Sequence, residues 1–195
     1  MAHSHIYAWK QRKLRDVVEI VGGGTPDTSN PEFWNGEIDW YSPTEIGEKI
    51  YANGSNKTIT YLGLEKSSAK LLPAQKTILF TSRASIGDMA ILIKAGATNQ
   101  GFQSFIVNDE MDIYFLYSMG YKIKEFALKN ASGSTFLEIS KNELGKMDIF
   151  IPPTKAEQQA IGEFFRQLDD TIAFHQRELE KYQQLKQVLL DQLFV

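Results

Sequence analysis

The chain has 195 residues, of which 43% are hydrophobic, 12% aromatic and 23% charged. This is enough for one folded domain with an appendage, or for two small domains. No apolar run approaches the roughly 18 residues of a transmembrane helix. No secretion signal is visible at the start of the sequence. Cys is absent, which excludes disulfides and thiolate metal sites and fits a cytoplasmic protein without a membrane partner.

The charge distribution says more than the net charge of -3. Residues 156–195 hold four Lys or Arg against seven Asp or Glu and account for all of it, so residues 1–155 are neutral. Within them, residues 57–94 carry six basic side chains against two acidic ones, a local charge of +4. A DNA-facing patch there would bind with modest, salt-sensitive affinity.

In the first half of the chain, hydrophobic spacing predicts a short helix over 14–21, ended by Gly22-Gly23-Gly24. An ordered loop over 25–31 follows, and then a strand over 38–41. Residues 77–81 and 89–93 are typical of the two strands of a hairpin, and 102–107 of a further strand.

In the second half, the sequence predicts a buried helix over 111–129, a polar loop over 132–135 and a last strand over 146–151. Pro152-Pro153 marks a domain boundary. Thr154 and Glu157 fit a capping box that opens a long helix. We therefore expect an α+β protein: a mixed α/β domain over 1–153, here called the head, followed by a long coiled-coil-forming helix over 154–195.

The long helix has an apolar stripe with alternating steps of four and three residues, which is the pattern of a coiled coil. A helix of this length, about 50 Å or more, is too long to bury its stripe against the head, so we expect a C2 homodimer. The predicted dimer contacts, called the seam, are Ile161, Phe165, Leu168, Ile172, His175, Leu179, Tyr182, Lys186, Leu189 and Leu193.

Several short motifs, in order along nearly the whole chain, together resemble the specificity subunit of type I restriction-modification enzymes. Each is weak alone, but the ordered set is specific. They are Lys13-Leu-Arg-Asp-Val17, Gly22-Gly-Gly-Thr-Pro26, Trp34-x-Gly36-x-Ile38-x-Trp40, Thr81-Ser-Arg83, Ile86-Gly87, Thr98-Asn-Gln-Gly-Phe102, and Ile149-Phe-Ile-Pro-Pro153 with Glu157-Gln158.

The resemblance implies a target recognition domain that reads double-stranded DNA without catalysing a reaction. A separate methyltransferase subunit would bind S-adenosylmethionine and extrude the target adenine, and a restriction subunit would join the complex. The chain itself would need no cofactor. Family members usually carry two recognition domains held apart by two antiparallel helices, so we expect this chain to act as a half-subunit on a bipartite site.

Enzymatic alternatives find little support in the sequence. Asn30-Pro-Glu-Phe-Trp34 is a near miss for an amino-methyltransferase motif, because Glu32 replaces a proline. No Asp or Glu has Lys two positions later, as a nuclease of the Asp/Glu-x-Lys type requires. The glycine run is not followed by Gly-Lys-Ser/Thr, so it favours close backbone packing over phosphate binding. His3 and His5 have no third metal ligand nearby.

Residues with donors and acceptors for base edges and phosphates occur in several polar loops. Arg83 is equally compatible with a surface ion pair. Asn99-Gln100 belongs to one of the motifs that recognition domains with different targets share, which favours holding the fold or contacting the DNA backbone over reading bases. Base-reading residues are expected in the segments outside the shared motifs, such as 51–70 and 129–141, where Tyr51, Asn53 and Asn56 are further candidates. The predicted DNA contacts are Thr25, Lys57, Ser82, Arg83, Asn99, Gln100, Gln103, Ser132, Ser134 and Lys141. A rival hypothesis is that the chain is an assembly or regulatory protein, which binds the methyltransferase subunit through its long helix and does not read DNA.

Overall fold

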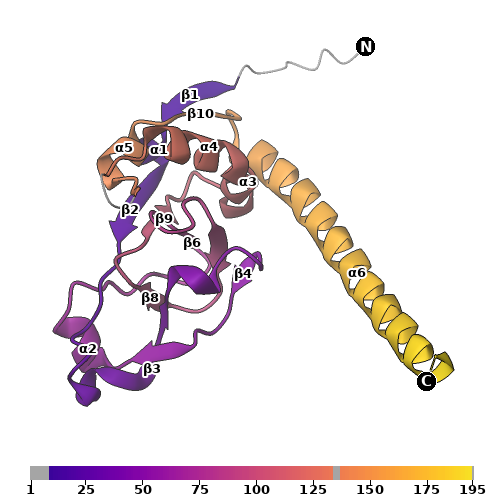
Figure 1. The fold of residues 1–195 in the computed structure, drawn as a ribbon. Helices are drawn as coiled ribbons and strands as arrows, with labels where there is room; N and C mark the ends of the chain where they lie inside the picture. Colours follow the sequence, from indigo (N-terminus) through magenta and orange to yellow (C-terminus); the bar gives the residue numbers. More distant parts are fainter. Residues whose placement is uncertain (1–8, 134–136, 195) are drawn as a thin grey trace, which may run out of the picture.

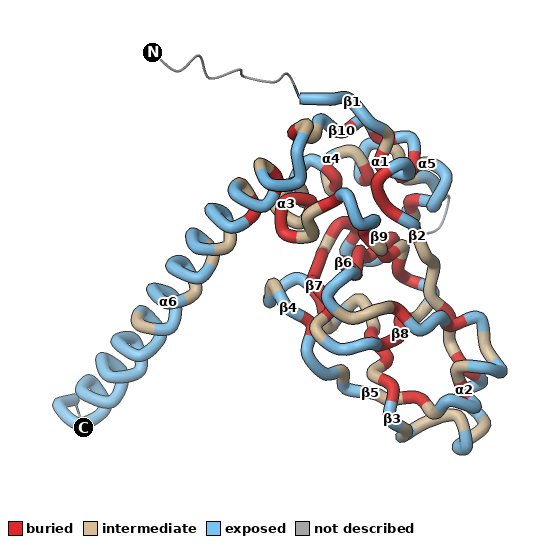
Figure 2. The backbone as a smooth tube through the Cα atoms, turned by 180° about the vertical axis from the view of Figure 1, so that it is seen from behind, coloured by how far each residue is buried: buried red, intermediate tan, exposed pale blue. Residues whose placement is uncertain are grey.

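The computed structural model describes residues 9–133 and 137–194. A mixed α/β head carries a single long helix, α6 (Lys155–Leu193), which projects away from it (Figure 1). At 1.5 Å per residue α6 is about 58 Å long. Only its first turns pack against the head, and Figure 2 shows the remainder almost entirely exposed. This confirms the α+β class and the long C-terminal helix.

The centre of the head is a five-stranded sheet in the order β2-β9-β6-β7-β4. All neighbours are antiparallel except β4 and β7. Side chains alternate between its faces, as strands require: Ile78 and Phe80 enter one apolar core, and Leu79 enters another. The strands are β2 (Val18–Gly22), β4 (Tyr51–Ala52), β6 (Thr77–Phe80), β7 (Met89–Leu92) and β9 (Gln103–Val107).

Short helices cover the first face of this sheet and complete the larger core. They are α1 (Leu14–Val17), α3 (Ile113–Ser118), α4 (Gly120–Asn130) and α5 (Lys141–Gly145). On the same side, a two-stranded ribbon of β1 (Lys10–Lys13) and β10 (Asp148–Ile151) joins the start of the head to its end. Because β10 leads directly into α6, this ribbon fixes where the long helix starts.

A smaller three-stranded sheet, in the order β5-β3-β8, forms the opposite end of the head (Figure 1). It consists of β3 (Trp34–Tyr41), β5 (Lys57–Ile59) and β8 (Gly96–Thr98), with α2 (Tyr61–Glu65) and the turns η1 (Pro31–Phe33) and η2 (Pro43–Glu45) beside it. A third apolar cluster around Ile38 and Trp40 fills it. This sheet ends at Thr98, directly before the Asn99–Gln103 segment.

The prediction of a helix over 14–21 is wrong beyond Val17, because Val18 to Gly22 pair with β9. The β-branched residues of this stretch are buried alternately along the sheet, and this tertiary pairing overrides helical spacing. Gly22 is therefore the last residue of a strand, and Gly23 and Gly24 follow that strand instead of ending a helix. The predicted helix over 111–129 is divided into α3 and α4 at Met119, where Gly120 lowers helix propensity.

The hairpin of β6 and β7, the strands β3, β9 and β10, and the start of α6 are confirmed. The hydroxyl of Thr154 accepts from the Glu157 backbone N–H at 3.2 Å. The Glu157 carboxylate does not complete the expected capping box and instead accepts from the Trp9 indole N–H at 3.2 Å. Thr154 is thus the N-cap, while Glu157 ties α6 to the start of the described chain.

Candidate nucleic-acid interface

The segment Asn99–Gln103 connects the two larger sheets and is held by its own backbone. The Asn99 side-chain oxygen accepts from the Gly101 N–H at 2.7 Å, and the Asn99 N–H donates to the Tyr41 carbonyl at 3.0 Å. An asparagine that bonds two residues ahead stabilises a turn. Asn99 is therefore used to shape the segment, which agrees with the alternative that it holds the fold.

The glycine run after β2 lies directly on this segment. Gly24 donates to the Thr98 carbonyl at 2.8 Å. A Cβ atom on Gly23 would come within 2.0 Å of the Asn99 carbonyl oxygen, far closer than real contacts allow. Only glycine permits this approach of two backbones. The approach brings Thr25, which follows Gly24, to the exposed side chain of Gln100.

Thr25 orients Gln100 by donating its hydroxyl hydrogen to the Gln100 side-chain oxygen. An amide oxygen has two lone pairs and the amide nitrogen has two hydrogens. The bond to Thr25 therefore leaves one acceptor site and both donors of Gln100 unused by this contact. These are the groups that a glutamine uses to bind the N6 and N7 edge of adenine in the major groove.

Ser82 and Arg83 lie in the turn between β6 and β7 and flank the Asn99–Gln103 segment. The Ser82 N–H donates to the Gly101 carbonyl at 2.8 Å, and its carbonyl accepts from the Ile139 N–H at 3.0 Å. Ser82 is fully buried, so it supports the loops and does not lie on their surface. Arg83 is partly exposed beside Gly101, and it makes no ion pair with any carboxylate in the described ranges.

The polar loop after α4 attaches to Arg83 through Glu138. Glu138 forms β-bridges with both Arg83 and Ser132, and its backbone exchanges two hydrogen bonds of 3.0 Å with Ser132. Ser132 is exposed. Ser134 lies outside the described residues. We call the set Thr25, Arg83, Gln100 and Ser132 the loop surface, since contacts join their four segments into one.

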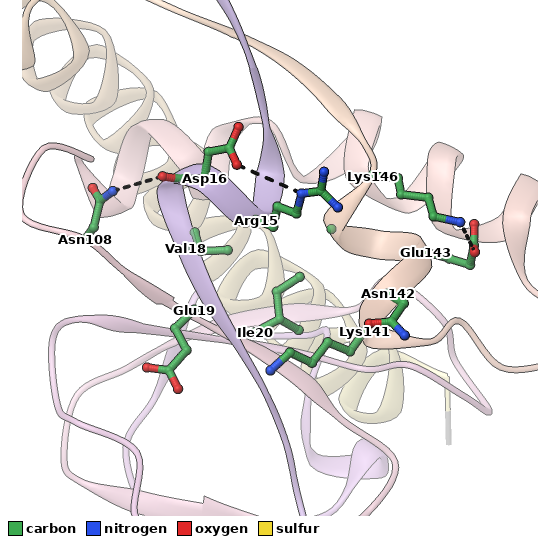
Figure 3. A pocket seen from close by; sticks show the side chains of 11 residues that line it. Arg15, Asp16, Val18, Glu19, Ile20, Asn108, Lys141, Asn142, Glu143 and Lys146 are labelled. Atoms are coloured by element: carbon green, nitrogen blue, oxygen red, sulfur yellow. Dashed lines mark hydrogen bonds and ion pairs between the residues drawn. The ribbon is translucent and has the colours of Figure 1, made fainter.

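The other predicted DNA contacts lie elsewhere. Gln103 is only partly exposed, and its side-chain oxygen is buried without a partner in the described structure. Lys57 lies on β5, with its ammonium 5.8 Å from the centre of the Trp34 ring, a cation–π contact. Lys141 extends along Ile20 in a groove of about 750 Å³ between β2 and α5 (Figure 3).

The electrostatics of the loop surface are mixed. Close to Thr25, the hydroxyl and backbone N–H of Ser29 donate to the Asp27 carboxylate at 2.7 and 2.9 Å. These bonds lower the pKa of Asp27, so this carboxylate stays charged at neutral pH. A fixed negative charge here disfavours phosphate, and leaves Arg83 as the cation of the loop surface.

The joint between head and helix is built from α3 and the first turns of α6. Gln158 is buried and accepts from the Asp112 N–H at 3.0 Å. The Tyr114 hydroxyl donates to the Asp169 carboxylate at 2.8 Å. Burial and this bond raise the pKa of Tyr114, and burial, with a smaller effect from Asp169, raises the pKa of Tyr117 to about 12. Both hydroxyls are neutral at physiological pH.

The seam is largely uncovered. Ile161 packs against the core of the head. The following apolar seam residues are exposed by 42% or more of their surface: Phe165, Leu168, Ile172, Leu179, Tyr182, Leu189 and Leu193. His175 and Lys186 are also exposed. A stripe of this size along one helix is unusual for a surface that faces only water.

The described residues contain neither a candidate metal site nor a candidate membrane-spanning helix. Across 9–133 and 137–194, no three His, Cys, Asp or Glu side chains are grouped to hold a metal ion. In the same part of the chain, no helix combines the length and hydrophobicity needed to cross a bilayer. Sequence reasoning missed Glu138. Its role depends on contacts between distant segments, so no local signal could have identified it.

Comparison with known proteins identifies the family. A family model described as type I restriction modification DNA specificity domain matches residues 7–184. The chain is 34% identical over 192 residues to the type I restriction enzyme MjaIX specificity subunit of Methanocaldococcus jannaschii, covering 96% of this chain and 44% of that protein. It is 24% identical to the HindI specificity subunit of Haemophilus influenzae, covering 95% and 40%. The chain thus spans about two fifths of the length of these relatives.

Solved structures share the fold. The S subunit of a type I restriction-modification system from M. genitalium superimposes with a TM-score of 0.65 at 18% identity, over 100% of this chain and 48% of that one. The HsdS subunit of Thermoanaerobacter tengcongensis gives 0.63 at 19% identity, over 99% and 47%. The family description names DNA specificity, which is recognition and not catalysis, in agreement with the expectation of a non-enzyme. The chain belongs to the family of type I restriction-modification DNA specificity domains.

Proposed function

We propose that this chain reads one half of a bipartite DNA site through the loop surface and directs a separate adenine methyltransferase subunit to it. The observation that carries the proposal is Gln100, exposed at a junction of three segments and oriented by Thr25. Base readout needs side chains held in advance on rigid supports, because ordering them on binding would cost affinity.

The two best-placed base readers differ in chemistry. Gln100 offers the donor and acceptor pair that matches adenine, whereas Arg83 offers the bidentate donors that match guanine. Ser132 and Thr25 can reach phosphates or base edges with hydroxyls. Asn99, Ser82 and Glu138 would shape the loops from beneath. Sequence preference would therefore depend on Gln100 and Arg83 more than on the local charge of 57–94.

Helix α6 would serve two partners. Its seam would join a second copy in a C2 homodimer with antiparallel helices. The methyltransferase subunit would bind a second apolar surface, predicted at Phe164, Phe174, Leu185, Val188 and Leu190, all at least 39% exposed. That subunit would supply S-adenosylmethionine and the methyl transfer, and a restriction subunit would join the assembly. The present chain would contribute recognition and spacing.

The test is sequence selection from random double-stranded DNA by the complex of this chain with its methyltransferase subunit, at a fixed salt concentration. A good bidentate contact contributes about 1–3 kcal/mol of discrimination. Gln100→Ala and Arg83→Ala should therefore each weaken cognate binding roughly 5-fold to 150-fold and relax one position of the site. Lys70→Ala, which removes an exposed charge from the same basic segment, is the matched control and should lower all affinities equally.

A second function, assembly without DNA reading, is favoured by the neutral charge of residues 1–155. It predicts a stable complex with the methyltransferase subunit whose binding to DNA has no sequence preference. Unchanged cognate affinity in both Gln100→Ala and Arg83→Ala would remove the loop surface from the recognition role.

A further inference from the structure

The part of the seam that is free to bind a partner begins after the joint with the head. Ile161 packs against the core of the head. Phe165 is 42% exposed but lines a groove together with Tyr117 and Tyr121 of the head. Leu168, Ile172 and Leu193 are exposed by 43%, 54% and 74%. A partner helix would therefore cover the stretch from Leu168 to Leu193. Within it, all seam positions are apolar or aromatic except His175 and Lys186.

These two polar positions restrict how two copies can pair. In a parallel coiled coil each seam residue faces its own counterpart. Lys186 would then face a second Lys186, and His175 a second His175. Two ammonium groups placed opposite each other destabilise the pair, and no acidic seam residue compensates them. An antiparallel arrangement avoids the Lys186 conflict, because it brings different seam positions together.

One antiparallel register pairs every polar seam position with a polar one. It joins Leu168 to Leu193, Ile172 to Leu189, His175 to Lys186, and Leu179 to Tyr182, with the two-fold axis between the last two. We propose that this register is the one adopted, and that the contact of His175 with Lys186 of the second copy fixes it. A neutral imidazole can accept a hydrogen bond from an ammonium group, and a single polar seam pair is a known determinant of register.

A one-heptad slip in one direction places His175 against Leu193, an apolar residue. A slip in the other direction is worse on three counts. It would place Lys186 against Leu168 and His175 against Leu179, leaving both polar groups without a partner. It would bring Glu178 close to its own copy at the two-fold axis. It would also require Ile161 as a contact, although Ile161 packs against its own head.

The proposed register has a consequence for DNA spacing, and here it rests on the proposed function. Gly162, where α6 leaves the head, lies 18.5 residues from the two-fold axis, so the two joints are about 55 Å apart at 1.5 Å per residue. A slip of one heptad would change this distance by about 10 Å, which is about three base pairs of B-DNA. The polar pair would therefore determine the separation of the two recognised half-sites.

Replacing His175 with a residue of opposite or like charge tests the register in the 195-residue chain. His175→Glu would pair with Lys186 of the second copy, whereas His175→Lys would repel it. Each pair occurs twice in the dimer, so His175→Glu should tighten self-association roughly fivefold and His175→Lys should weaken it by a similar factor. The double variant His175→Lys/Lys186→Glu should restore wild-type affinity. Sedimentation equilibrium measures all four proteins.

The other arrangements give different results. In the slipped register position 175 faces Leu179 of the second copy, and in the parallel coil it faces position 175 of the second copy. In either arrangement both single variants would weaken the dimer. That result would overturn the proposed register. Because the chain has no Cys, a disulfide can check it: Ile172→Cys/Leu189→Cys should cross-link two copies, and Phe165→Cys/Leu189→Cys should not. The reverse outcome, or a monomeric wild-type chain, contradicts the proposal, while DNA reading is judged separately by the selection experiment.

Discussion

Replacing Gly162 with Ala should destabilise the protein, although the same change in an exposed helix would stabilise it. On helix propensity alone, Gly→Ala contributes about 1 kcal/mol in favour of the folded state. In this structure, however, a Cβ atom at Gly162 would lie 2.6 Å from the Asp112 carboxylate oxygen and 2.9 Å from the Phe115 backbone nitrogen. Both contacts are shorter than real Cβ atoms show, so α6 or α3 must move.

The magnitude follows from what has to move. Asp112 is the N-cap of α3, and its carboxylate accepts from the Phe115 N–H at 2.8 Å; displacing it costs about 1 kcal/mol. Separating two packed helices to admit a methyl group costs about 1–3 kcal/mol. After subtracting the propensity gain, Gly162→Ala should lower the free energy of unfolding by about 1–3 kcal/mol. For a chain of this size, that lowers Tm by roughly 2–12 °C.

Urea unfolding followed by circular dichroism measures the difference, with two controls. Ala160→Gly exchanges the same two residue types at an exposed site in the same helix and should also destabilise, by about 1 kcal/mol. Asp112→Ala removes the nearest clashing atom, so the double variant should lose less than the sum of the single losses. A Gly162→Ala protein more stable than wild type would refute the close packing of α6 on α3.

Three further results are expected. Gly23→Ala should weaken cognate DNA binding at least tenfold and destabilise the head by about 1–3 kcal/mol, because its Cβ would meet the Asn99 carbonyl oxygen; unchanged binding in a selection assay would contradict this. The raised pKa of Tyr117, about 12, means that its contribution to stability is full below the unfolded tyrosine value of about 10 and is lost as pH rises from there towards 12; Tyr117→Phe should flatten that fall in alkaline unfolding, and an equally steep curve would argue against it. Leu168→Asp with Leu179→Asp should give monomers by light scattering, since it places carboxylates in the apolar seam, and a surviving dimer would argue against the seam.

The sequence predicted those features whose signal is local. The long helix and its Thr154 cap follow from residue spacing and cap chemistry within one segment, and the β6–β7 hairpin follows from two apolar runs joined by a polar turn. The Val18–Gly22 strand was missed because its identity depends on β9, about 85 residues away.

The candidate site divides in the same way. Thr25 and Gln100 were chosen for their chemistry, but their contact joins positions 75 residues apart and no spacing rule predicts it. The burial of Ser82, and the link from Arg83 through Glu138 to Ser132, likewise depend on how distant segments fold together. Residue type could therefore suggest candidates, whereas only the fold could separate supporting residues from exposed ones.

The central claim is that this chain gives a methyltransferase its DNA sequence specificity. The most direct measurement is to co-express the chain with its methyltransferase subunit and to map methylated adenines at base resolution on random DNA. The account predicts a palindromic site of two half-sites at one fixed spacing, as expected for a C2 dimer with one reading head per copy. A stable complex that leaves the DNA unmethylated, or methylates it without sequence preference, would contradict it.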